Sequence, residues 1–232
     1  MRFTGRRLPL RADRADSDYG GRAMSFTGWP EEALDFYEEL EIDNSKAYWS
    51  QHKAVYEEKV LRPMTELVEE LAPEFGDPRI FRPYRDIRFS KDKSPYKTSI
   101  AATIGSGYVH LSAKGLAAGD GMYHMGPGQL DRYRRAVAAD GSGRDLERVI
   151  SSIESGGIAV TGHDALKTAP RGYPAGHPRI RLLRFKGLIA WQEWPVEPWL
   201  GTAAAKDRIV AFLRSARPLS TWLDQHVGAE TA

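Results

Sequence analysis

Hydrophobic residues recur at helical spacing near both ends of the chain, and their spacing shortens toward two in the middle. From Pro30 onward, apolar positions are separated by three and four residues, which predicts a helix over about residues 30–40. A second, longer helix is predicted from an N-cap at Asn44 toward Leu71. Pro63 falls inside this helix, and a kink or a break is expected there because an interior proline costs about 3 kcal/mol.

The central part of the chain predicts a series of short strands. Their alternating apolar and polar residues lie at positions 84–90, 97–104, 108–113 and 116–124. The links between the last three runs are short and contain glycine, which favours a reversal of the chain. Short links join antiparallel neighbours, because parallel strands need a long crossover.

The second half of the chain mixes helices and strands. Helices are predicted at 127–139, 143–155 and 203–216, strands at 157–161 and 187–194, and a loop rich in proline and glycine at 168–178. Pro218 is expected to separate the last helix from a final amphipathic piece. The whole pattern predicts an α+β fold: a central, mostly antiparallel sheet, a meander of about four or more strands, flanked by N-terminal and C-terminal helices.

The periodic patterns indicate one domain. Residues 24–228 are expected to form a single α+β domain, followed by a tail at 229–232. Residues 1–23 are rich in arginine, aspartate and glycine and have little to bury, so we expect a disordered leader. The segment "MSFTGWPEEAL" resembles the beginning of a protein chain. We therefore hypothesise that Met24 is the natural initiator and that the leader is not native.

Composition narrows the classes of function. The chain of 232 residues has 33 basic and 31 acidic residues, so its formal charge of +2 leaves little global attraction for nucleic acid or a membrane surface. The absence of cysteine excludes disulfides and thiolate metal sites, and it fits a cytoplasmic location. No apolar run approaches the roughly 20 residues that span a bilayer, so no membrane association is expected. Cofactors and oligomeric state stay unknown at this level.

Positive charge is nevertheless concentrated in the segment "RPYRDIRFSKDKSPYKTS", residues 82–99. From Arg79 to Lys97, seven basic residues oppose two acidic ones, which leaves a local charge of +5. On a strand, Arg85 would share a face with apolar side chains and would need an anionic partner or a wet pocket. Two interpretations stay open: an anion site, because arginine binds carboxylate or phosphate through its planar fork, or a structural Arg–Asp network with a solvated lysine loop.

An anion site would give individual residues distinct roles. The ligand-binding residues would be Arg85, Arg88, Ser90, Lys91, Lys93, Tyr96 and Lys97, joined by Arg171 from the proline-rich loop. Asp86 would orient an arginine, and Tyr96 would donate a hydrogen bond. His124, at a strand end beside glycines, is the best candidate for a general acid or base.

Other chemistries have weaker support. Ser90 and Lys93 satisfy a Ser-x-x-Lys spacing, but that chemistry needs both residues on one face of a helix. None of the six histidines forms a His-x-x-x-His pair, so no metal site is predicted, and glycine-rich phosphate loops are absent. Trp191, Trp194 and Trp199 could form a stacking surface, but packing in the core is favoured because tryptophan is mostly buried.

The segment "FRPYRDIRFSKDKSPYKT" closely resembles the signature of the bacterial family called domain of unknown function 2461. Three further stretches resemble the same family: the opening "FTGWPEEALDFYEEL", the turn "GDGMYHMGP" and the later "APRGYPAGHPRIRLLRFKGL". The resemblance covers about residues 26–226. It implies no activity, substrate or cofactor, because none is established for the family.

Three functions therefore stay open. The basic segment could bind, or act on, an anionic small molecule that carries a phosphate or a carboxylate. It could instead bind nucleic acid or another polyanion, although the near-neutral global charge disfavours this. Finally, the segment could be an internal salt-bridge lattice in an interaction scaffold. The sequence does not decide whether the protein is an enzyme.

Overall fold

The computed structural model describes residues 25–88 and 90–230. The expected leader at 1–23, the expected start at Met24 and the end of the tail at 231–232 lie outside these ranges. None of the helices in the described ranges combines the length and the apolar character that crossing a membrane requires.

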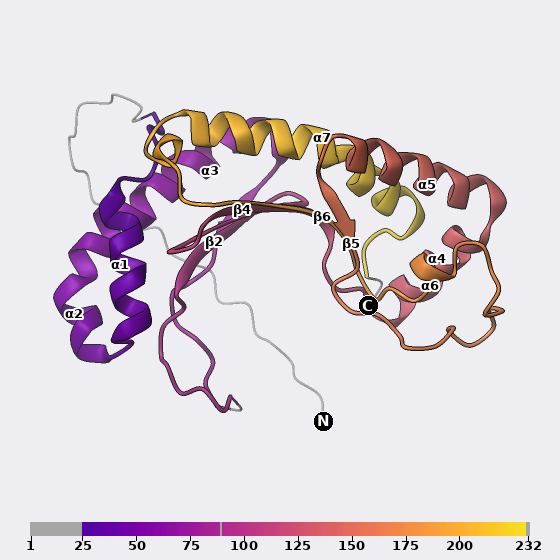
Figure 1. Ribbon diagram of the computed structural model, residues 1–232, viewed down its shortest axis with the longest axis horizontal. Coiled ribbons are helices and arrows are strands. Elements are labelled where there is room, and N and C mark those ends of the chain that lie inside the picture. Colours follow the sequence, from indigo (N-terminus) through magenta and orange to yellow (C-terminus); the bar gives the residue numbers. More distant parts are fainter. Residues whose placement is uncertain (1–24, 89, 231–232) are drawn as a thin grey trace, which may run out of the picture.

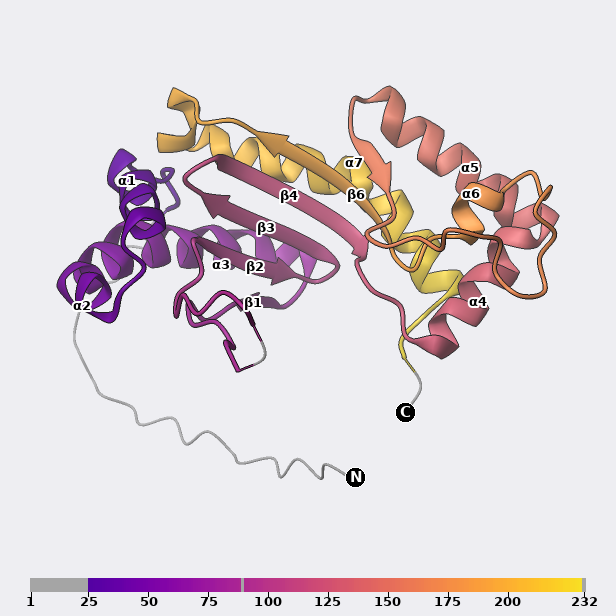
Figure 2. The ribbon, with the colours of Figure 1, turned by 60° about the horizontal axis from the view of Figure 1, so that its bottom comes forward.

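A six-stranded antiparallel sheet forms the centre of the molecule, in the order β1-β2-β3-β4-β6-β5 (Figure 2). The strands are β1 (Pro78–Ile80), β2 (Ser99–Ile104), β3 (Gly107–Ser112), β4 (Gly115–Met122), β5 (Ala159–Thr161) and β6 (Leu188–Trp194). Tight links join β2 to β3 and β3 to β4, as predicted for antiparallel neighbours. The α+β fold with a mostly antiparallel sheet is therefore confirmed.

Helices cover one face and both ends of this sheet. They are α1 (Glu31–Ile42), α2 (Lys46–Val55), the π-helical turn η1 (Tyr56–Leu61), α3 (Arg62–Phe75), α4 (Pro127–Ala138), α5 (Asp140–Ser155), α6 (Ile180–Leu183), the 3₁₀ turn η2 (Pro198–Gly201) and α7 (Ala204–His226). Figure 1 shows α3 and α7 on one face, α1 and α2 at one end of the molecule, and α4, α5 and α6 at the other.

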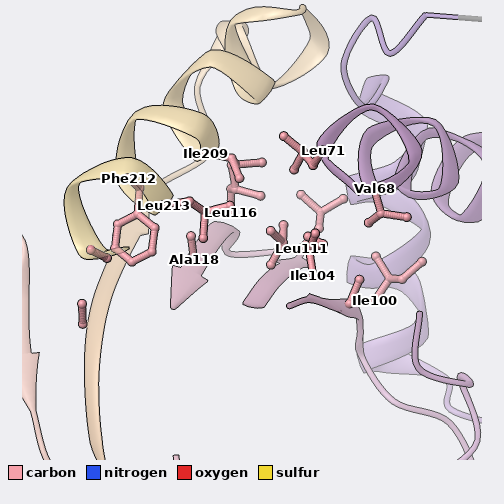
Figure 3. Close-up of a cluster of buried hydrophobic side chains, with 14 of the residues drawn as sticks. Val68, Leu71, Ile100, Ile104, Leu111, Leu116, Ala118, Ile209, Phe212 and Leu213 are labelled. Atoms are coloured by element: carbon pink, nitrogen blue, oxygen red, sulfur yellow. The ribbon is translucent and has the colours of Figure 1, made fainter. Parts of the chain in front are cut away.

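The core lies between the sheet and the two helices on its covered face. Ile100 and Ile104 of β2 and Leu111 of β3 are fully buried and face Val68 of α3 and Leu213 of α7 (Figure 3). This arrangement explains the period of two in the central sequence, because only alternate side chains of a strand can face the same helix layer.

The entry into the second helix and its interruption differ in detail from the prediction. Ser45, rather than Asn44, is the N-cap of α2, and its hydroxyl accepts a hydrogen bond from the Tyr48 N–H at 3.1 Å. The helix does not break at Pro63. The wider turn η1 instead precedes it directly, which accommodates a residue that has no N–H to donate to the preceding turn.

The expected separation at Pro218 is wrong, because α7 continues through this residue to His226. Leu213 and Ala216 before the proline, and Leu219 after it, belong to one buried stripe. Burying a large aliphatic side chain contributes about 1.5–3 kcal/mol, so a stripe on both sides of Pro218 offsets the cost of about 3 kcal/mol for one interior proline.

A buried arginine fixes the end of α4 against α6. The side chain of Arg179 is only 5% exposed, and it donates to the carbonyl oxygens of Val137 at 2.6 Å, Ala138 at 3.1 Å and Ala139 at 3.3 Å. Glu147 lies 3.5 Å from the guanidinium. The carbonyl groups at a helix C-terminus lack partners within the helix, so Arg179 supplies donors to them; the bond to Val137 is buried, and the Ala139 carbonyl also accepts from the Gly143 N–H at 2.9 Å.

Replacing this arginine tests its structural role. Arg179→Leu should lower the free energy of unfolding by about 2–4 kcal/mol, because it removes the donor of the buried hydrogen bond to the Val137 carbonyl and of the half-buried one to the Ala138 carbonyl. Arg181→Leu on the same short helix is the matched control, since Arg181 is exposed, and its effect should stay within about 0.5 kcal/mol. Urea denaturation of both variants measures the difference, and equal effects would contradict this role.

Candidate functional site

The face of the sheet opposite α3 and α7 carries polar and aromatic side chains. In β3, Val109 and Leu111 are fully buried beneath the helices, whereas Tyr108 and His110 belong to the opposite face and are half-buried. Figure 2 looks onto this second face, and no helix of the described ranges crosses it. We call it the open face.

Aromatic rings on the open face meet around Tyr108. Its ring centroid lies 5.9 Å from that of Trp191, 6.3 Å from that of His110 and 6.5 Å from that of Phe81. The strand register explains the contact with Trp191, because Tyr108 and Trp191 both pair with Gly119 of the strand between them. Residues directly opposite in neighbouring strands share a face, so the two rings lie in one row across the sheet.

Gly119 makes room for the indole in this row. A Cβ atom at this position would lie 2.9 Å from Cε3 of Trp191, which is closer than side-chain contacts allow. The glycine is therefore required for close approach of the ring to β4, and not for a special backbone conformation.

A cavity of about 800 Å³ lies over these rings. Its lining residues are Phe81, Thr103, Ser106, Tyr108, Gly119, Asp120, Gly121, Tyr123, Thr161, Gly162, His163, Ile189, Trp191 and Glu193. Tyr123 and His163 add a stacked pair whose ring centroids are 3.6 Å apart. The volume and the mixture of aromatic walls with a few polar groups are typical of small-molecule sites.

Acidic groups occur at two positions of the cavity. Glu193 accepts a hydrogen bond from the Trp191 indole N–H at 2.9 Å, which orients the indole. Asp120 is buried, and its Oδ2 accepts from the Ser220 hydroxyl at 3.2 Å, while its Oδ1 has no hydrogen-bond partner among the described residues. Burial raises the pKa of Asp120 above its ordinary value, and hydrogen bonding by Ser106 and Ser220 opposes the rise. Because Ser220 belongs to α7, the Asp120 carboxyl group is turned toward the covered face of the sheet, and Glu193 is the acid that lies beside the rings of the open face.

The basic segment at residues 82–98, called the basic loop below, adjoins this sheet but is not a strand. The prediction of a strand at 84–90 is wrong: the described part of the loop forms one isolated bridge between Tyr84 and Tyr96, and the Arg85 N–H bonds to the Pro95 carbonyl at 2.9 Å. Prolines on both sides of this bridge remove N–H groups that a longer ladder would need. The first strand of the sheet, β1, instead lies just before the basic loop, at Pro78–Ile80.

Asn44 and Trp49 hold the basic loop against the N-terminal helices. The Asn44 side chain accepts from the Tyr96 N–H at 3.0 Å and donates to the Tyr96 carbonyl at 3.1 Å. The Tyr96 ring stacks on Trp49 with centroids 4.2 Å apart and planes 6° from parallel. Tyr96 is thus buried and serves as the anchor of the loop.

Two arginines of the basic loop are neutralised by acids of the same loop. Arg88 forms a two-pronged ion pair with Asp86, at 2.9 Å and 2.6 Å, and Arg85 pairs with Asp92. The hydrogen bonds from Arg88 lower the pKa of Asp86 from its ordinary 3.8 to about 2. Hydrogen bonds from Ser94 and then Arg85 lower the pKa of Asp92 even further.

Two other cations lie near Phe81 without such partners. Lys97 Nζ lies 5.5 Å, and the Arg79 guanidinium 5.8 Å, from the centroid of the Phe81 ring, which lines the cavity. Among the described residues, no carboxylate lies within 4.0 Å of Arg79, Arg82 or Lys97. Burial and then the charge of Arg82 lower the pKa of Lys97, and Arg82 also adds to the lowering of the pKa of Asp86 by Arg88. The positive charge of Lys97 and Arg79 is therefore left without an ion pair at this edge of the cavity.

The remaining candidate residues lie apart from these cations. Ser90 and Lys93 are not on a helix, and the Lys93 ammonium donates to the Ile87 carbonyl at 3.0 Å; Lys91 is exposed. His124 is exposed and follows Tyr123 without lining the cavity. Arg171 is exposed in the loop before α6, at the other end of the sheet from the basic loop (Figures 1 and 2).

The cavity residues went largely unrecognised in the sequence. Phe81, Tyr108 and His163 come from three distant segments, and no motif joins them. Trp191 was expected in the core, yet it lines the cavity; Trp194, by contrast, packs edge-to-face against Phe212 of the core. The described ranges contain no group of three or more histidine and acidic side chains placed to hold a metal ion.

Fold and cavity together define an α+β protein whose antiparallel sheet is covered by helices on one face and hollowed on the other. The chain belongs to the family described as a conserved hypothetical protein (DUF2461), which matches residues 32–222 and confirms the family resemblance of the sequence. A search of curated proteins gives no match. A conserved hypothetical protein from Pyrococcus furiosus is a solved structure with 15% sequence identity and a TM-score of 0.36, over 72% of this chain and 95% of that one.

Acid titration tests the ion pairs of the basic loop. Because the pKa of folded Asp86 lies below its ordinary 3.8, the contribution of its pair with Arg88 is complete above about pH 4 and is lost as the pH falls through about 2. Carbon-detected NMR titration should show this midpoint, and Arg88→Gln should return it toward 3.8. Lys91→Gln is the control, and a midpoint of Asp86 that responds equally to both substitutions would contradict the pairing.

Proposed function

We propose that the protein binds, or acts on, a small molecule that carries a phosphate or carboxylate group. The molecule occupies the cavity on the open face, and its anionic group lies beside Lys97, Arg82 and Arg79. The observation that carries this proposal is the uncompensated positive charge next to Phe81, a residue that belongs to the cavity wall.

Lys97 has the setting expected of an anion ligand. Its ammonium is partly withdrawn from water, which disfavours the charged form, and Arg82 adds like-charge repulsion. A bound anion would relieve both penalties, so part of the binding free energy would come from the removal of this repulsion. An exposed lysine such as Lys91 offers no comparable gain.

In this proposal the arginines with internal partners shape the loop. Asp86 and Asp92 already occupy the guanidinium groups of Arg88 and Arg85, and an incoming anion would have to displace a carboxylate. Tyr96 contributes through its stacking on Trp49. We assign no part in the site to His124, which is exposed, or to Arg171, which is exposed in the loop before α6 at the other end of the sheet from the basic loop.

Removal of one cation tests the proposal. Isothermal titration calorimetry with inorganic phosphate, pyrophosphate, adenosine monophosphate and benzoate should detect binding of at least one anion. Lys97→Met should weaken that binding about tenfold or more, because a hydrogen bond to a charged group contributes about 1.5–3 kcal/mol.

The matched control is Lys91→Met, which removes the same charge from the same loop and should change the affinity less than about twofold. Equal losses in the two variants would place the anion over the whole loop, and a loss in Arg88→Gln alone would place it at the paired arginines; either result contradicts the proposal. Binding of a single-stranded oligonucleotide, with a steep fall in affinity as salt rises and no affinity for the small anions, would support a polyanion binder instead.

A further inference from the structure

Two rings of the open face have planes close to that of Tyr108. The plane of Tyr108 is tilted 14° from that of His110 and 30° from that of Trp191, whereas Phe81 is tilted 41° from it. Tyr108 and Trp191 are half-buried and line the cavity, so part of each ring is available to a ligand.

A second flat group borders the same cavity. Tyr123 and His163 stack with planes 28° apart, and the Tyr123 side chain is exposed. Burial, and then the nearby Tyr123, raise the pKa of the Tyr108 hydroxyl. The cavity is therefore bordered by the rings around Tyr108 and by the pair Tyr123–His163, and aromatic rings stack on such partners in an offset geometry.

The cationic edge lies within reach of these rings. Lys97 Nζ is 5.5 Å from the Phe81 centroid, and that centroid is 6.5 Å from Tyr108, so the ammonium lies within about 12 Å of the Tyr108 ring. At its other side the cavity offers Glu193, whose Oε1 accepts from Trp191. A carboxylate only accepts hydrogen bonds, so its other oxygen would suit an N–H or O–H of a ligand.

From these observations we infer that the cavity binds a planar aromatic anion, with its ring stacked on Tyr108 and its phosphate or carboxylate at Lys97. This inference rests on the proposed function and adds the ring to it. Nucleoside monophosphates and aromatic carboxylates share this chemistry, and they differ in whether a spacer separates the ring from the charge.

Probes that contain the ring, the anion or both separate the two halves of the inference. Adenosine monophosphate carries both groups, ribose 5-phosphate only the anion, and adenosine only the ring; benzoate and cyclohexanecarboxylate form the corresponding carboxylate pair. Adenosine monophosphate or benzoate should bind at least about tenfold more tightly than the probes of its set that lack the ring or the anion. The reason is that stacking of one base contributes about 1–3 kcal/mol.

Variants of Tyr108 test whether the aromatic ring of the ligand stacks on this side chain. Tyr108→Leu should weaken binding of the aromatic anion about tenfold and leave the non-aromatic anion unchanged, whereas Tyr108→Phe should retain both affinities. Gly119→Ala should act in the same direction as Tyr108→Leu, because its Cβ displaces the Trp191 indole. Thermal unfolding of each variant establishes that it is folded.

The possible failures are distinguishable. If ribose 5-phosphate and cyclohexanecarboxylate bind as tightly as their aromatic partners, and Tyr108→Leu has no effect, the ring inference is wrong while the anion site at Lys97 stands. If Tyr108→Leu weakens binding of adenosine and adenosine monophosphate equally, and Lys97→Met changes neither, the cavity takes neutral rings and the anion site is wrong. The absence of binding by all five probes at millimolar concentration would overturn both.

Discussion

Burial of one face of the sheet beneath α3 and α7 is the constraint on which the rest of the structure depends. It forces β2, β3 and β4 to place aliphatic residues such as Ile104 and Leu111 on one side, and therefore leaves the intervening residues on the other. Tyr108 and His110 are such intervening residues. The open face and its cavity thus follow from the packing of the opposite face, and Gly119 leaves room for the Trp191 indole to lie against β4.

Polar contacts secure the two covering helices to each other at the same time. Lys206 at the start of α7 pairs with Glu70 of α3 at 2.5 Å, and Arg214 forms a two-pronged pair with Glu74 at 2.9 Å and 2.8 Å. The other carboxylate oxygen of Glu70 accepts a hydrogen bond from the Phe26 N–H at 2.6 Å. This bond holds the segment before α1 at the same place. The Lys206–Glu70 pair is half-buried, whereas the Arg214–Glu74 pair is exposed. An exposed pair contributes little to stability, so the main effect of Arg214 is on the relative placement of the helices.

The sequence supported much of the fold and little of the site, for a physical reason. Helices such as α1 and strands such as β2 and β3 bury a regular stripe of their own residues, and that periodicity is local. The alternation of Tyr108 with Val109 was equally visible. Which side of β3 is covered, however, depends on α7, about a hundred residues further along the chain, and so the open face could not be identified from the strand alone.

The errors at Pro218 and at the predicted strand 84–90 have the same origin. Pro218 weakens a helix locally, but the burial of residues on both sides of it is a tertiary effect. Residues 84–88 alternate like a strand, yet a strand needs a partner with free backbone groups, and the nearest segment of chain contains Pro95. In both places a local pattern was overridden by what lies next to it in space.

Ion pairs within the basic loop determine which of its cations are left to attract an anion. Of the cations counted in the sequence, Arg85 and Arg88 have acidic partners two to seven residues away, so their charge is cancelled close to its source. Lys97 forms no ion pair among the described residues, and Arg82 lies near enough to lower the pKa of Lys97 and, after Arg88, that of Asp86. The two ion pairs are neutral, so the local charge of +5 stays on Arg79, Arg82, Lys91, Lys93 and Lys97. Lys91 is exposed and Lys93 donates to the Ile87 carbonyl. Lys97 and Arg79 lie near Phe81 of the cavity wall, so these two cations are the ones placed to attract an anion to the cavity.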